Sequence, residues 1–117
     1  MLTNKAKQVA NEIYNLLLRG RQSYQSYLKN GRSFLYAKIL KNNNEALHSY
    51  LLKYMHLFPQ DLSSASLDLI NHIDVWSVLW EQLALETKPS LEDEFVFENS
   101  VNYPKHFDLL IEEYLRN

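Results

Sequence analysis

Glycine is nearly absent from this chain, and its scarcity restricts the folds that are open to it. Only two of the 117 residues are glycine, whereas an antiparallel sheet needs many tight turns with positive φ, which glycine mainly supplies. Helices joined by loops rich in asparagine and proline need far fewer glycines. Because 46% of the residues are apolar, the chain can also bury a core. The sequence therefore predicts an all-α fold, an antiparallel bundle of four to five helices, in a single helical domain over residues 1–117.

Apolar residues at helical spacing divide the first half of the chain into three predicted helices. The first begins after Thr3, a suitable N-cap, and its apolar stripe ends at Gly20. The second covers about 21–41. The asparagine run Asn42–Asn44 is the clearest break, because asparagine competes for backbone hydrogen bonds and favours helix caps. A third helix is then predicted over about 45–58.

The pair Asn30–Gly31 interrupts the second of these stripes and has two interpretations. It ends a helix as a C-cap, where glycine tolerates a positive φ. Alternatively, Gly31 lies on a buried face and lets a neighbouring helix approach closely. The sequence leaves both open.

The longest apolar seam predicts a central helix over about 62–87, which begins shortly after Pro59 and ends before Pro89. Its apolar face is broad, which indicates neighbours on more than one side. Trp76 and Trp80 lie four residues apart on this face, as core residues do. If the pair is exposed instead, it forms an anchor for a partner.

The region after this helix is short and acidic. Residues 91–98 are predicted to form a helical turn or an irregular segment, and Phe95–Phe97 is equally compatible with an extended strand. Pro104 fits the first position of a last helix, where its missing N–H leaves no bond unmade. The buried stripe of that helix contains Phe107, Leu110, Ile111, Tyr114 and Leu115.

Charge is sorted by halves. Residues 1–58 contain nine basic and two acidic side chains, and residues 59–117 contain three basic and twelve acidic ones, although the formal net charge is only −2. Three interpretations of the acidic half remain open. It neutralises the basic half through surface pairs that each contribute little, it docks a basic protein surface, or it mimics nucleic acid.

No catalytic, cofactor-binding or metal-binding pattern is present in the sequence. The absence of cysteine excludes thiolate metal sites and cysteine nucleophiles and fits a reducing compartment. The two glycines are too far apart for a phosphate-binding loop. Glu45 and His48 form one Glu-x-x-His pair, whereas a di-iron bundle needs two. We therefore expect a non-enzymatic protein without cofactor or metal.

The sequence also lacks a secretory signal and any apolar run approaching the roughly 20 residues that span a bilayer. We therefore expect a cytoplasmic protein without a membrane segment.

The function expected from these patterns is binding to another protein with a basic surface. The candidates are an adaptor, a regulator, an immunity-type inhibitor or a subunit of a complex. Phe95 or Phe97 is expected to supply an apolar anchor, and Glu86, Glu112 and Glu113 are expected to extend the acidic surface. The predicted partner-binding residues are Glu92, Asp93, Glu94, Phe95, Phe97 and Glu98.

Two further classes of function remain. The basic half interleaves cations with tyrosines, which is the combination that nucleic-acid surfaces use. The acidic half would repel nucleic acid, so this class is the alternative. A molecule with two opposite charge poles can also pair with itself, which makes a homodimer the third class.

Overall fold

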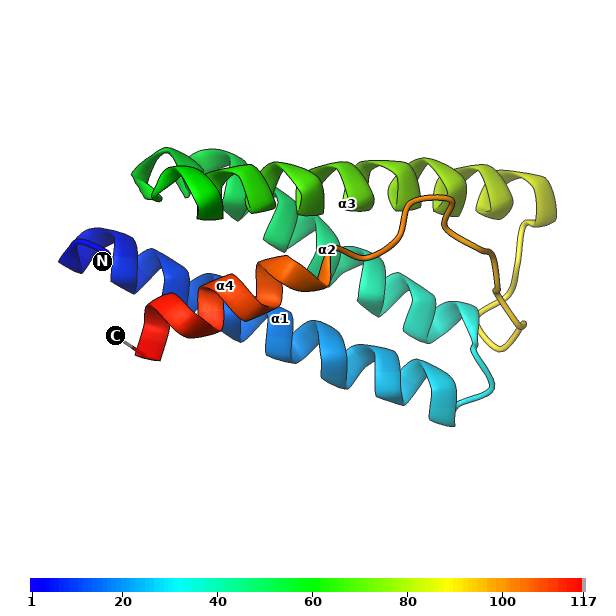
Figure 1. Cartoon of the computed structure of the whole chain (residues 1–117). Coiled ribbons are helices and arrows are strands. Elements are labelled where there is room, and N and C mark those ends of the chain that lie inside the picture. Colours follow the sequence, from blue (N-terminus) through cyan, green and yellow to red (C-terminus); the bar gives the residue numbers. More distant parts are fainter. Residues whose placement is uncertain (117) are drawn as a thin grey trace.

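The computed structural model describes residues 1–116 and shows four α-helices, each antiparallel to the one before it (Figure 1). The prediction of an all-α bundle is confirmed. A single 3-10 turn, η1, joins the second and third helices. The elements are α1 (Asn4–Lys29), α2 (Phe34–Tyr54), η1 (Met55–Leu57), α3 (Gln60–Thr87) and α4 (Lys105–Arg116).

Helix α1 begins where the sequence predicts, because the Thr3 side-chain oxygen accepts the Ala6 N–H at 3.1 Å. The predicted end at Gly20 is wrong, since α1 continues to Lys29. The predicted break at Asn42–Asn44 is also wrong, because these residues lie in the middle of α2.

The same contact explains both errors. Asn43 is buried, and its Nδ2 donates to the Leu16 carbonyl oxygen of α1 at 3.0 Å. Gly20 lies opposite, where an added Cβ would stand 3.0 Å from that nitrogen. The missing side chain of Gly20 and the bonded amide of Asn43 therefore fit together at the α1–α2 contact, and neither residue ends a helix.

This contact predicts an energetic coupling between Gly20 and Asn43. Alanine is favoured over glycine in a helix by about 1 kcal/mol, but Gly20→Ala forces the Asn43 amide away from Leu16. We expect Gly20→Ala to stabilise the protein by about 1 kcal/mol in an Asn43→Ala background and to have almost no effect in the wild type. Urea denaturation of the four proteins measures the difference. An identical effect in both backgrounds would show that the two side chains do not compete for space.

Gly31 lies in the turn after α1, so the first of its two interpretations, the end of a helix, is correct. Its φ is +69°, it is exposed, and an added Cβ would meet no atom within 4 Å. Asn30 caps α1, and its side-chain Nδ2 donates to the Ser26 carbonyl oxygen at 2.7 Å. Gly31 is therefore needed for its backbone conformation, and the close helix approach occurs at Gly20 instead.

Within residues 1–116, the interior contains two separate apolar clusters. The larger one joins α1, the second part of α2, the first part of α3 and α4. The smaller one contains Phe34, Ala37, Trp80 and Phe95 and lies at the end where α1 meets α2. The expectation that the tryptophan pair packs in the core is confirmed, because Trp80 is buried and Trp76 packs against the smaller cluster.

Helix α3 contributes to both clusters but lies along one side of the bundle (Figure 1). Its outer face stays open and exposes three apolar side chains, Leu67, Val78 and Leu85. The broad apolar face of this helix is therefore only partly covered, although the sequence predicted a central helix.

Helix α4 begins at Lys105, one residue after the predicted first position Pro104, and packs against α1 and α3. Its twelve residues are too few to cover the whole length of these helices. Over the remaining length the chain between α3 and α4 takes its place, and this segment contains the predicted partner-binding residues.

Candidate partner-binding surface

Residues 91–98, which we call the acidic strap, are anchored to the start of α2. The Asp93 and Leu91 carbonyl oxygens accept the N–H groups of Phe34 and Leu35 at 2.8 and 2.9 Å. These two N–H groups belong to the first turn of α2, where helical partners are missing. Since the N-cap residue of α2 makes no side-chain hydrogen bond, the strap provides this cap.

The strap is mainly extended. Leu91 and Glu92 form a turn, and Glu94 makes an antiparallel bridge with Ser33. The Phe95 N–H donates to the Arg32 carbonyl oxygen at 2.8 Å. Residues 91–98 therefore form a turn and an irregular segment, as predicted, and the side chains of Glu94–Phe97 alternate between exposed and buried as in an extended chain.

Phe95 is the anchor of the strap, but it is turned inward. It is only 2% exposed, and its ring centroid lies 5.0 Å from those of Phe34 and Trp80. The prediction that Phe95 offers a partner an exposed anchor is therefore wrong. Phe97 is half-buried against Trp76, with ring centroids 5.8 Å apart, so most of its ring is also engaged internally.

The exposed apolar residues of the strap differ from those that the sequence predicts. Val96 is 50% exposed and Leu91 is 46% exposed. In an extended segment, side chains alternate between two faces, so burial of Phe95 and Phe97 turns Val96 outward. The alternation was visible in the sequence, but which face is buried depends on the distant residues Phe34 and Trp80.

The four carboxylates of the strap are all exposed: Glu92, Asp93, Glu94 and Glu98. Within residues 1–116, none of them forms an ion pair. Asp93 Oδ2 accepts the Ser90 N–H at 2.8 Å, which closes the turn at the start of the strap.

Internal neutralisation between the two halves is limited. In the described part of the chain, only two ion pairs join an arginine or lysine of the first half to a carboxylate of the second. These are Arg21 with Asp108 at 2.8 Å and Lys41 with Glu81 at 3.4 Å. Exposed pairs of this kind contribute up to about 1 kcal/mol each.

The charged groups do not form two remote poles. The strap is bonded to the α1–α2 loop through the Arg32 carbonyl oxygen, so its acidic residues lie beside this basic residue of the first half. Glu112 and Glu113 lie on α4 instead, where Glu112 accepts the Tyr14 hydroxyl at 3.3 Å. Tyr14 and Tyr27 both lie on α1, and Tyr27 contacts the strap. The rise of the helix separates the two residues by roughly 20 Å along its axis. These two glutamates therefore do not extend the strap surface.

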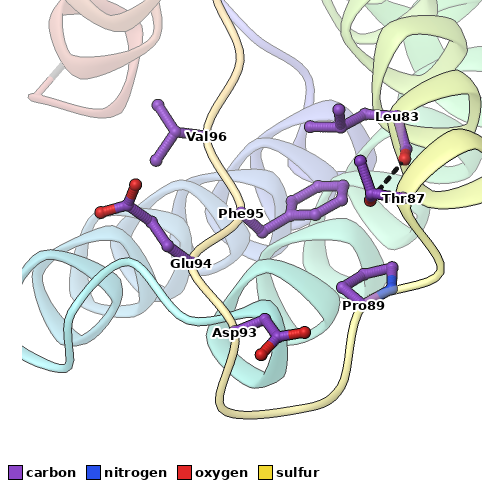
Figure 2. Close-up of a pocket in the computed structure, with 7 residues that line it drawn as sticks. All are labelled: Leu83, Thr87, Pro89, Asp93, Glu94, Phe95 and Val96. Carbon is purple, nitrogen blue, oxygen red and sulfur yellow. Dashed lines mark hydrogen bonds between the residues drawn. The ribbon is translucent and has the colours of Figure 1, made fainter.

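A hollow of about 450 Å³ lies between the strap and the carboxyl end of α3 (Figure 2). Asp93 and Phe95 point toward α3, whereas Glu94 and Val96 point to the other side of the strap. From α3 and the turn that follows it, Leu83, Thr87 and Pro89 complete the lining. The structure thus brings Asp93, Glu94 and Phe95 of the predicted site together at one hollow.

Tyr27 gives the strap a dependence on alkaline pH. Its hydroxyl donates to the Phe95 carbonyl oxygen. Burial raises the pKa of Tyr27 above the ordinary 10.0, Arg32 opposes the rise, and Tyr24 and Glu94 add to it. Because the pKa is higher in the folded state, the stability that this proton confers is fully present below about pH 10 and is lost as the pH rises through the folded pKa.

We therefore expect the free energy of unfolding to fall less steeply above about pH 10 in Tyr27→Phe than in the wild type. Urea denaturation at a series of pH values measures both slopes. Equal slopes would mean that Tyr27 does not couple the strap to pH.

Within residues 1–116, no three His, Cys, Asp or Glu side chains are grouped so that they could hold a metal ion. No helix in this part of the chain combines the length and apolar character needed to cross a bilayer. The chain matches no protein family, and no curated protein or solved structure shows significant similarity to it.

Proposed function

We propose that the chain is a non-enzymatic intracellular protein that binds a basic surface of another protein through its acidic strap. The observation that carries this proposal is the exposure of four carboxylates on one short segment, without an ion pair in the described part of the chain. Such a cluster attracts a basic surface and raises the rate and specificity of association.

The way in which the strap is held supports this proposal. Backbone hydrogen bonds and the buried Phe95 ring fix the segment before any partner arrives. Because a preorganised surface loses little conformational entropy on binding, its contacts contribute more fully to affinity. Val96 and Leu91 add exposed apolar surface beside the charges.

Charge reversal on the strap tests the proposal. The double variant Glu92→Lys, Glu94→Lys places positive charge on the strap, which then repels a basic partner. We expect its affinity for the partner to fall at least about tenfold. Affinity capture from native cells first identifies the partner with wild-type bait, and titration of the purified partner then measures each variant.

The matched control is Glu12→Lys with Glu113→Lys, which changes the net charge equally at two exposed sites on α1 and α4. Binding of this control should stay close to that of the wild type. Equal losses in both variants would mean that only total charge matters, and no loss in the strap variant would disprove the proposed surface.

Nucleic-acid binding by the basic half is the second candidate. Of the nine basic side chains in residues 1–58, only Arg21 and Lys41 form ion pairs with described residues. Tyr24, near the carboxyl end of α1, is 50% exposed and stacks on Tyr27. Binding of DNA or RNA that weakens steeply with salt would favour this candidate, and no binding at low salt would remove it.

A further inference from the structure

The acidic strap has one backbone edge that is already paired and one that is not. Consecutive residues of an extended chain direct their N–H and C=O groups to opposite edges. Asp93 and Phe95 use the edge that faces the α1–α2 loop and α2, through their bonds with Phe34 and Arg32. Glu94 and Val96 therefore direct their backbone groups to the other edge, where no group in residues 1–116 pairs with them.

The surroundings of this free edge leave room for another chain. Glu94 and Val96 both line the hollow of about 450 Å³ between the strap and the end of α3. Their side chains are exposed and point away from α3 (Figure 2). An unpaired strand edge beside an open hollow is the feature to which extended segments add in β-augmentation.

The charges around the free edge indicate which kind of segment can pair with it. The strap carries four carboxylates, whereas Arg32, the basic residue bonded to it, lies on the edge that is already paired. A second copy of this chain is disfavoured, because pairing two such edges would bring like charges opposite each other. A segment with basic side chains meets the opposite charge instead.

We propose that the free edge of Glu94 and Val96 accepts an extended, lysine- or arginine-rich segment of the partner protein as an added β-strand. This inference rests on the proposed function and adds the mode of recognition. Backbone hydrogen bonds hold the segment, and its cationic side chains contact Glu92, Glu94 and Glu98. The stems of these side chains lie along Val96.

Two substitutions at Val96 separate backbone pairing from charge attraction. Val96→Pro removes an N–H that is unpaired within residues 1–116, and Phe95 before it lies outside any helix, which suits a residue before proline. Val96→Ala keeps the N–H and shortens the side chain. Both variants keep every carboxylate, and thermal unfolding checks that both keep the fold.

The probe is a six-residue peptide of alternating lysine and valine with blocked ends. We expect Val96→Pro to bind it at least about tenfold more weakly than Val96→Ala, because both variants lose the valine side chain but only proline cannot donate to the added strand. In the wild type, saturating peptide should slow hydrogen exchange of the Glu94 and Val96 amides, which NMR measures without any variant.

Three results would overturn the added strand: equal affinities of the proline and alanine variants, unchanged amide exchange, or no binding of the peptide at low salt. None of them removes the proposed function, which fails only if the natural partner is insensitive to the strap charges.

Discussion

Replacing Phe95 with alanine is expected to lower the free energy of unfolding by about 3–5 kcal/mol, the usual loss for a fully buried aromatic ring. The ring is 2% exposed and lies between Phe34, Trp80 and Phe97. Its removal leaves a cavity in the smaller cluster and takes away the buried apolar contact between the strap and the bundle. Urea denaturation measures the loss.

The matched control is Val96→Ala on the same strap. Val96 is 50% exposed, so its truncation should change stability by less than about 0.5 kcal/mol. A similar small effect for Phe95→Ala would mean that the strap is not packed on the bundle as described.

The second large effect is expected at Phe107, which anchors α4 in the larger cluster. Its side chain is 0% exposed, and Phe107→Ala should destabilise the protein by about 3–5 kcal/mol. Leu109 is 67% exposed on the same helix, and its substitution by alanine should have little effect.

Equal effects at the two positions of α4 would contradict its orientation. Because Phe95 and Phe107 belong to different clusters, we further expect the binding surface to survive Phe107→Ala at temperatures where that variant remains folded.

Local signals in the sequence were sufficient for the helical class and for several boundaries. Thr3 caps α1, Pro59 precedes α3 and Pro104 precedes α4, because capping and proline geometry act within a few residues. Trp80 was recognised as a core residue from its helical spacing alone.

The errors arose where a distant contact overrides a local preference. Gly20 and Asn43 are poor helix residues, but each is accommodated by the other across the α1–α2 contact. Likewise, Phe95 is buried because the strap pairs with residues 32–35, about 60 positions away in the sequence. No pattern within residues 91–98 indicates that pairing.

The charge split was clear in the sequence, but its spatial arrangement was not. The antiparallel α1–α2 pair brings residues 29–38 to the end of the bundle where the strap returns. Basic and acidic groups therefore adjoin there, and the homodimer expected from two remote charge poles loses its support. Association with a different, basic protein does not depend on such poles.

The most direct test of the account is hydrogen exchange of the backbone amides in the purified complex with the captured partner. We expect exchange to slow within residues 91–98, including Glu94 and Val96, and to stay unchanged in the basic segment 19–38. Slowing confined to residues 19–38, with the strap exchanging as in the free protein, would contradict it.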